Sequence, residues 1–394
     1  MVKKRIAGFW LFLNCLLLVF VGCGENKHNS QFPPKKDSAK VETQKNEPVS
    51  KNEPITLLSY FSESDVLKAR TDSIISKMSD EELAGQMIIA SYGELGRSKE
   101  QILKLINGKK IGGAVILKGD ASQLKQQIEA LNIFAKNEGA LPLLFSCDAE
   151  PSLFNSKLRG TPDVLNASDI NTLKSAGETA LTISKFLREN RFSQNYAPVC
   201  DFDLNKEIIG NRSFGHETRK VTELALEFVR ISQLEGIVAT AKHFPGHGTV
   251  KGDSHSSIVY IDGELRELEV FRSIIEKGII SVMVGHIAIK NNKDYDTDGL
   301  PSTMSGKIVT DLLRTKLGFN GIIITDAMNM GAVTSFTTPS LRAVKAGCDL
   351  ILMPTNEEAL HSSILEFMKN AQSRDQVVNS VKRIIRLKIC LGLI

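Results

Sequence analysis

From residue 57 onward, short apolar runs alternate with longer segments whose apolar residues recur at helical spacing. Most of the short runs are continuously apolar rather than alternating, which is typical of strands in a parallel sheet covered on both faces. Eight such runs predict strands, at residues 87–90, 113–117, 141–148, 194–200, 238–243, 281–286, 321–326 and 349–353.

The segments between these runs predict helices. Helical spacing covers most of the gaps, at residues 121–137, 173–190, 219–235, 265–277 and 306–317. Ser79 and Glu82 form a capping box, which begins a further helix that reaches Met87. Eight strands with crossover helices indicate an α/β fold, a (β/α)8 TIM-type barrel, with a doubly wound open sheet as the alternative. We expect a single catalytic domain over residues 57–394.

The first 23 residues have the pattern of a targeting segment. A Lys-Lys-Arg cluster at residues 3–5 precedes an apolar run at residues 6–21, which is short for a spanning helix and typical of a signal peptide. The Gly-Cys ending at Cys23 resembles a bacterial lipobox, which implies that Cys23 becomes the lipidated N-terminus. An uncleaved anchor is the alternative.

Residues 24–56 are polar and rich in lysine, and they predict a disordered tether. Together with the lipobox-like ending, this tether predicts a lipoprotein that is attached to the membrane through its N-terminal lipid anchor. We expect the protein in the cell envelope, on the periplasmic or the outer-membrane or extracellular side.

The composition is that of an ordinary globular chain. Of the 394 residues, 42% are hydrophobic and 24% are charged, and the net charge is +4. No basic stripe with interleaved aromatic residues is present, so nucleic acid is not an expected partner. Four widely spaced cysteines without a C-x-x-C pattern predict buried free thiols rather than a disulfide framework. They are Cys147, Cys200, Cys348 and Cys390.

Charged and imidazole side chains end or follow five of the predicted strands. The active sites of barrel enzymes lie at the C-terminal ends of the strands. A charged side chain next to an apolar run is also costly to bury without a partner. Any one of these residues could form a structural ion pair, but agreement at five strand ends favours a functional site. They are Asp148, Asp201 with Arg212, Lys242 with His243, His286, and Asp326.

The densest group of such residues is the segment 241–257, which holds three of the seven histidines. Its glycines and Pro245 predict a shaped loop, here called the histidine loop. Asp253 and His255 are close enough in sequence for the carboxylate to bond one imidazole nitrogen and aim the other at a ligand. A zinc site and a purely structural loop are the alternatives. The ligands of such a zinc site would be His243, His247, Asp253 and His255.

The segment 242–248, followed by Asp253, Ser254 and His255, resembles the signature of glycoside hydrolase family 3, specifically of its β-N-acetylglucosaminidase branch. The resemblance covers roughly residues 70 to 394 and implies a single barrel domain. The other matching segments, given in chain order, are residues 211–215, 300–305, 312–314, 317–321, 324–331, 346–349 and 353–354.

The resemblance implies a role for each matching residue. Asp326 would be the nucleophile that forms a glycosyl-enzyme ester, and His255, paired with Asp253, would be the general acid/base. No metal and no organic cofactor is implied. The residues that would contact the sugar are Asp148, Arg212, Lys242 and His243, with His286 near the same pocket.

The implied function is that of a retaining glycoside hydrolase, a β-N-acetylhexosaminidase that removes terminal β-linked N-acetylglucosamine through a covalent intermediate. Such chemistry needs a carboxylate at the reacting carbon and a second group that protonates the leaving oxygen. A histidine, whose ordinary pKa is about 6.5, suits the second task. The expected carbohydrate substrates are peptidoglycan fragments (muropeptides) or chitin-type N-acetylglucosamine oligosaccharides.

One segment departs from the family pattern. Members usually continue the third-strand aspartate as Asp-x-Glu-Gly-Gly, whereas this chain has Glu150, Pro151 and Ser152 after Asp148 and Ala149, so both glycines are lost. This departure motivates the alternative of a non-catalytic sugar-binding lipoprotein on the same fold. A metal-dependent hydrolase, and a phosphorylase in which phosphate replaces water, are further alternatives.

Overall fold

The computed structural model describes residues 54–394, so the predicted signal peptide, Cys23 and the tether up to residue 53 lie outside the described residues. Eight parallel strands form one sheet, and each predicted strand is present. In chain order they are β1 (Ile88–Tyr92), β2 (Gly113–Ile116), β4 (Leu144–Cys147), β6 (Gln194–Asn195), β7 (Val238–Phe244), β9 (Ser281–Val284), β11 (Ile322–Thr325) and β12 (Ile351–Leu352).

The sheet closes into a barrel where β11 meets β12. Ile324 and Leu350 form a parallel bridge, and the Thr325 N–H donates to the Leu350 carbonyl over 3.0 Å. On its other side β12 pairs with β1 in parallel register. This ring confirms the predicted (β/α)8 barrel and excludes the doubly wound open sheet, which would leave two edges unpaired.

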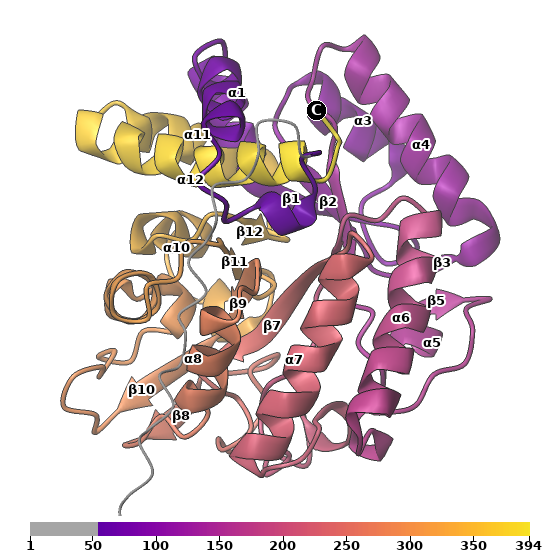
Figure 1. The fold of residues 1–394 in the computed structure, drawn as a ribbon. Coiled ribbons are helices and arrows are strands. Elements are labelled where there is room, and N and C mark those ends of the chain that lie inside the picture. Colours follow the sequence, from indigo (N-terminus) through magenta and orange to yellow (C-terminus); the bar gives the residue numbers. More distant parts are fainter. Residues whose placement is uncertain (1–53) are drawn as a thin grey trace, which may run out of the picture. The chain divides into compact units, whose positions relative to one another are not determined.

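Helices connect consecutive strands and surround the barrel (Figure 1). Because helices cover the outside and side chains fill the inside, strand residues are buried on both faces, which explains the continuous apolar runs. The connecting helices are α3 (Lys99–Asn107), α4 (Ala121–Asn137), α6 (Leu173–Glu189), α7 (Thr218–Leu234), α8 (Leu268–Glu276), the π-helical η5 (Lys307–Lys316) and α10 (Pro339–Ala346).

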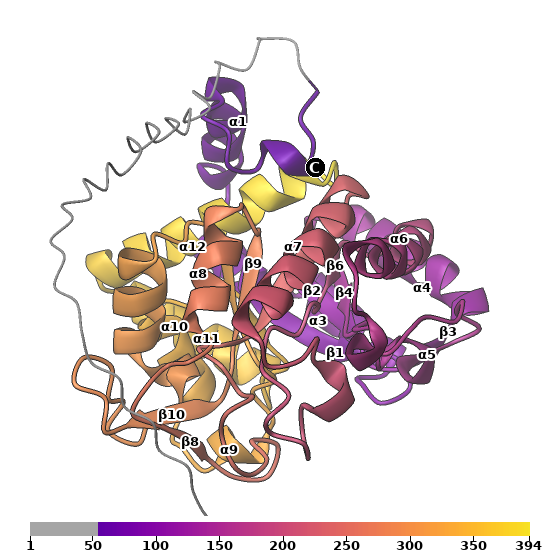
Figure 2. The same ribbon diagram turned by 60° about the horizontal axis from the view of Figure 1, so that its bottom comes forward.

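The two ends of the described chain cover the N-terminal end of the barrel. Before the first strand come η1 (Leu57–Ser59), α1 (Asp65–Ile75) and α2 (Asp80–Gln86), and after the last come α11 (Glu357–Met368) and α12 (Ala371–Cys390). Helix α1 packs on α12, as the two views show (Figures 1 and 2). The predicted capping box of Ser79 and Glu82 is confirmed at the start of α2.

Two small parallel sheets lie outside the barrel, and their strands were not among those predicted. In one, β3 (Gly119–Asp120) pairs with β5 (Leu158–Arg159). In the other, β8 (Val259–Asp262) pairs with β10 (Ile287–Lys290), and this pairing holds the chain where it leaves the histidine loop. Short helical turns are α5 (Phe154–Lys157), η2 (Ala167–Asp169), η3 (Gly210–Arg212), η4 (Ser302–Met304) and α9 (Gly331–Thr334).

The barrel core is apolar, and it contains the thiols that the sequence predicts to be free. Cys147, Cys200, Cys348 and Cys390 are all buried and unbonded to one another. Within residues 54–394, no helix is both long enough and apolar enough to cross a membrane.

Candidate active site

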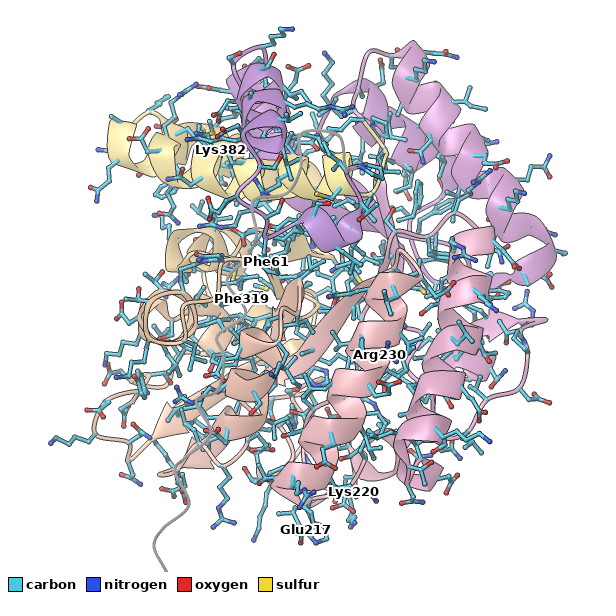
Figure 3. All side chains as sticks on the ribbon, in the orientation of Figure 1. Phe61, Glu217, Lys220, Arg230, Phe319 and Lys382 are labelled. Atoms are coloured by element: carbon cyan, nitrogen blue, oxygen red, sulfur yellow. The ribbon has the colours of Figure 1, made fainter. Side chains whose placement is uncertain are left out.

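The C-terminal ends of the barrel strands enclose a cavity of about 390 Å³. The loops of this end lie at the bottom of Figure 1 and come forward in Figure 2. In Figure 3, Glu217 and Lys220 mark this end of the molecule at the start of α7, whereas Lys382 lies toward the opposite end. Most of the residues predicted for the site line the cavity: Asp148, Arg212, Lys242, His243, His255 and Asp326.

Asp326 directly follows β11 and is partly exposed to the cavity. Its N–H donates to the Val284 carbonyl over 2.9 Å, and its Oδ1 accepts a 2.7 Å hydrogen bond from Ala327 N. Burial opposes ionisation, but the imidazoles of His243 and His286 and the Ala327 N–H outweigh burial and hold the pKa of this carboxyl below its usual value. Asp326 is therefore ionised at neutral pH, as a carboxylate nucleophile must be.

Four charged side chains form a cluster in the cavity wall. Arg212 donates from Nε and Nη2 to the two carboxylate oxygens of Glu150, over 2.8 and 2.7 Å. Lys242 Nζ lies 2.7 Å from Glu150 Oε1 and also donates to Asp148. Burial raises the pKa of Glu150, but Lys242 and Arg212 outweigh burial and hold it far below its usual value. Burial lowers the pKa of Lys242, yet Asp148 and Glu150 raise it above normal, so the ammonium stays charged.

Asp201 is a second buried carboxylate, and it anchors the start of the histidine loop. Its Oδ2 lies 2.6 Å from His243 Nδ1, and its Oδ1 accepts a 2.7 Å hydrogen bond from His247 N. Burial raises the pKa of Asp201, but His243 and these hydrogen bonds hold it below the usual value. The sequence places Asp201 at a strand end, and the structure shows that it orients the imidazole of His243.

His255 and Asp253 form the dyad that the sequence predicts. His255 Nδ1 lies 2.6 Å from Asp253 Oδ1, which also accepts the His255 N–H over 2.8 Å. These contacts outweigh burial and hold the pKa of Asp253 below its usual value. The His255 side chain is 62% exposed, and no described residue engages its Nε2. The imidazole therefore has one oriented nitrogen and one that is available to a ligand in the cavity.

The geometry of the histidine loop does not favour the zinc alternative. Its three imidazoles have separate partners, since His243 bonds Asp201, His255 bonds Asp253, and His247 Nε2 lies 2.9 Å from Ser254 Oγ. Across residues 54–394, no group of three or more His, Cys, Asp or Glu side chains is arranged to hold a metal ion. His247 is thus a cross-link within the loop, and burial lowers the pKa of its imidazole.

Comparison with known families agrees with this geometry. The profile of the glycosyl hydrolase family 3 N terminal domain matches residues 78–387, which is most of the described chain. The chain belongs to glycosyl hydrolase family 3. The matched span includes every strand-end residue of the cavity, so the family and the site rest on the same part of the molecule.

The chain is similar to several proteins named as glycosidases. It is 28% identical over 346 residues to a beta-N-acetylglucosaminidase/beta-glucosidase of Cellulomonas fimi, covering 81% of this chain and 59% of that protein. A beta-hexosaminidase of Vibrio cholerae is 31% identical over 257 residues, covering 63% of this chain and 76% of that protein. A family 3 beta-N-acetylglucosaminidase of a Paenibacillus species superposes with a TM-score of 0.73 at 29% identity, covering 80% of this chain and 63% of that one. The chain thus spans less than two thirds of the Cellulomonas and Paenibacillus proteins.

His286, which was also predicted for the site, lies behind the cavity wall rather than on it. It is buried, with Nδ1 2.9 Å from Thr303 Oγ1 and Nε2 3.0 Å from the Ala327 carbonyl. Burial lowers the pKa of its imidazole, and the charge of Asp326 opposes this. Its contact with Ala327 supports the backbone beside Asp326.

The departure from the family pattern at Pro151 and Ser152 is accommodated by a hydroxyl bridge. Ser152 Oγ donates to the Asn211 carbonyl over 2.7 Å and accepts a 2.9 Å hydrogen bond from Ala167 N. The Ser152 hydroxyl thus joins three segments of the chain. Glu150, directly before Pro151, keeps its ion pairs, so the loss of two glycines leaves the charged cluster intact.

Several residues at the site escaped prediction from the sequence. Lys157, in the short turn α5, lines the cavity and lies 3.7 Å from Asp148, but no pattern marks a four-residue turn. Glu267 is buried and accepts a 2.8 Å hydrogen bond from Gly248 N in the histidine loop. A glutamate just before an amphipathic helix is ordinarily a solvated cap, so its burial under the loop was not foreseeable. Other cavity residues are Tyr196, which lies in a predicted strand, and Asn329, Met330 and Met353, which lie in segments that match the family pattern; the sequence assigned none of them a role.

Proposed function

We propose that this family 3 member is a retaining β-N-acetylhexosaminidase that releases terminal β-linked N-acetylglucosamine, with Asp326 as nucleophile and His255 as general acid/base. One observation carries the proposal: the ionised carboxylate of Asp326 and the Asp253-oriented imidazole of His255 line the same cavity. A retaining glycosidase needs this combination of a carboxylate and a proton donor around one sugar ring.

The reaction proceeds in two steps. First, an Asp326 oxygen attacks the anomeric carbon and forms a glycosyl ester, while the glycosidic bond breaks and protonated His255 gives its proton to the leaving oxygen. Second, neutral His255 removes a proton from water, the water oxygen attacks the same carbon, and the ester bond breaks to restore the Asp326 carboxylate. Two displacements at one carbon retain the β configuration.

Asp253 has a supporting role in both steps. Its carboxylate holds His255 Nδ1, which leaves Nε2 to face the leaving oxygen, and its charge stabilises the imidazolium form of the ring. A low pKa of Asp253 keeps that charge present while His255 cycles between its two states.

The charged cluster is suited to binding the sugar. Lys242 and Arg212 supply N–H donors, Asp148 supplies acceptor oxygens, and His243 is oriented by Asp201. Because these groups are already paired with one another, a sugar hydroxyl that enters the cavity meets oriented donors and acceptors, which lowers the cost of ordering them during binding. His286 would act indirectly, through the backbone beside Asp326.

We further propose peptidoglycan fragments as the natural substrates, with chitin-type oligosaccharides as the second class. The proposal rests on the predicted lipidation of Cys23, which would place the enzyme in the cell envelope near peptidoglycan. A release assay on muropeptides and chito-oligosaccharides, with and without phosphate, tests the substrate class and also the acceptor. A glycosyl phosphate product would indicate the phosphorylase alternative.

The decisive experiment compares two site variants with matched controls. We expect Asp326→Ala to lower the release of nitrophenol from an aryl β-N-acetylglucosaminide by more than about 10⁴-fold, because no covalent intermediate forms. We expect His255→Ala to lower kcat by about 10²- to 10⁴-fold, the usual contribution of general acid–base catalysis.

The controls are Asp375→Ala, an exposed aspartate in α12, and His216→Ala. His216 forms a similar exposed pair, with Nδ1 2.8 Å from Asp203 Oδ1, but does not line the cavity. Both controls should keep wild-type activity. Full activity in the site variants would refute the proposed mechanism, and binding of N-acetylglucosamine without any turnover in the wild type would favour the non-catalytic alternative.

A further inference from the structure

The turn that carries His255 is held together from within. The Asp253 carbonyl accepts hydrogen bonds from Ser256 N and Ser257 N, both over 3.2 Å, and the Asp253 carboxylate accepts the His255 N–H. This turn, residues 253–257, therefore has a defined shape of its own. That shape does not by itself place His255 relative to the nucleophile, because the turn must also be fixed to the barrel.

Gly331 connects the turn to the nucleophile segment, and the contact of His247 with Ser254 connects it to the start of the histidine loop. The Gly331 N–H donates to the His255 carbonyl over 2.8 Å, and Gly331 begins α9 on the segment that leaves β11 through Asp326. Among residues 54–394, this is the backbone hydrogen bond that joins the 253–257 turn to the segment carrying the nucleophile. The acid/base residue is thus tied directly to the chain that holds its catalytic partner.

The contact also depends on the missing side chain of Gly331. A Cβ atom built at this position would lie 2.6 Å from the Ser256 carbonyl oxygen and 2.9 Å from the His255 carbonyl oxygen. Backbone oxygens cannot rotate away as the end of a side chain can, so the turn would have to move. The φ angle of Gly331 is outside the left-handed region, so alanine is allowed by the backbone and only the contact excludes it.

The segment between Asp326 and Gly331 is itself well held. Met328 N donates to the Leu352 carbonyl over 2.9 Å, and Met330 N donates to the Ala327 carbonyl over 3.1 Å. A Cβ at Gly331 would therefore displace the turn and not the nucleophile. Displacement of a catalytic group by about 1 Å can lower a rate by about 10²-fold.

We propose that Gly331 is a positioning residue: its amide and its lack of a side chain together fix the distance between His255 and Asp326. This inference rests on the proposed function, since it assigns Gly331 a role in the same reaction. The role is exerted through His255, so Gly331 matters most where the reaction needs a proton donor.

Two substitutions at Gly331 separate the parts of this contact. Gly331→Ala keeps the N–H donor and adds only the Cβ. Gly331→Pro removes the donor as well, and proline is tolerated at the first position of a helix. Met330 before it is extended, with φ −73° and ψ 148°, as a residue before proline prefers. The matched control is Gly306→Ala, because a Cβ at Gly306 meets nothing within 4 Å.

Kinetics with two substrates that differ in their leaving group tests whether His255 is correctly placed to donate its proton. For an aryl β-N-acetylglucosaminide with a poor leaving group, we expect Gly331→Ala to lower kcat/KM by about 10- to 100-fold, and Gly331→Pro by at least as much. For a dinitrophenyl β-N-acetylglucosaminide, whose dinitrophenolate group leaves without protonation, the loss of kcat/KM should be below about 3-fold. In a His255→Ala background, Gly331→Ala should have almost no further effect. Equal losses with both leaving groups, or wild-type rates in both variants, would overturn the proposal.

Limited proteolysis tests the contact between Gly331 and the 253–257 turn without a measurement of activity. Lys251 is exposed in the histidine loop and offers a trypsin site there. We expect cleavage after Lys251 to be several-fold faster in Gly331→Ala than in the wild type or in Gly306→Ala, with unchanged thermal unfolding. Equal cleavage in all three proteins would overturn the proposal even if the wild type hydrolysed no glycoside, so failure of the contact and failure of the proposed function can be told apart.

Discussion

Two buried lysines, one at each end of the barrel, have opposite surroundings. Lys242 lies at the C-terminal end against the carboxylates of Asp148 and Glu150. Lys388, in α12, lies at the N-terminal end, with Nζ 2.6 Å from Gln86 Oε1 and 3.0 and 2.7 Å from the carbonyl oxygens of Gly112 and Pro142. Both are buried, yet only the first has a charged partner.

The contrast shows that partners, and not burial alone, decide the charge of a buried group. Burial lowers both pKa values, but the two carboxylates raise the pKa of Lys242 above normal, while the pKa of Lys388 falls to about 7. Two buried glutamates repeat the contrast. Glu150 is paired with two cations and has a depressed pKa, whereas burial and the charge of Asp201 raise the pKa of Glu267 to about 7.

Replacing Lys242 should have the largest effect, because it breaks a buried charged cluster that also faces the cavity. We expect Lys242→Met to lower kcat/KM by about 10²-fold or more and the free energy of unfolding by about 3 kcal/mol. This loss of stability lies at the lower end of the range for breaking a buried ion pair, because Arg212 still pairs with Glu150. Steady-state kinetics and urea unfolding measure the two losses. An unchanged free energy of unfolding would show that the ion pairs of Lys242 do not stabilise the folded protein.

Replacing Lys388 should change the dependence of stability on pH and leave activity unchanged. Between about pH 7 and the ordinary lysine value of 10.5, the unfolded chain binds one proton more than the folded chain at this residue. The free energy of unfolding of the wild type should therefore rise with pH, by about 3 kcal/mol relative to Lys388→Met between about pH 7 and pH 9.5. Parallel pH profiles of the two proteins in urea unfolding would contradict a neutralised Lys388.

Replacing Glu267 should give a smaller change of the opposite sign. Its folded pKa of about 7 lies above the ordinary value of 4.5, so between these values the folded chain holds the extra proton. Stability of the wild type should thus fall as pH rises through this window, by about 2 kcal/mol relative to Glu267→Gln. Glutamine keeps an oxygen that can accept the Gly248 N–H and carries no charge. Thermal unfolding of both proteins at pH 5 and pH 8 tests this difference. An identical change of stability between the two pH values in the wild type and in Glu267→Gln would refute the raised pKa of Glu267.

The sequence predicted the barrel well because strand burial leaves a strong signal. All eight strands appear at the predicted places, since continuous apolar runs mark segments covered on both faces. The strand ends were equally readable, because a charge directly after such a run has few structural explanations. The predicted strand at residues 194–200 was too long, as β6 ends at Asn195 and the chain then bonds by isolated contacts.

Much of the candidate site was also readable, but the contacts that orient it were not. Asp326, His255 and Asp253 follow from the family signature; the structure brings Asp326 and His255 to one cavity and bonds Asp253 to His255. The burial of Glu267 under the histidine loop left no signal, and Gly331 lies in a segment that matches the family pattern but gives no sign of its contact with that loop. A buried glutamate and a solvated one look alike in sequence, and a glycine needed for a close contact resembles a glycine in any turn.

The sequence by itself determined the alternation of strands and helices, the polar strand ends and the pairing of Asp253 with His255, because each depends on residues close together in the chain. Only the tertiary structure decided how the barrel closes, which buried lysine keeps its charge, and how far the His255 turn lies from Asp326. These depend on groups far apart in the chain, whose energies exist only once folding has removed water and brought them into contact.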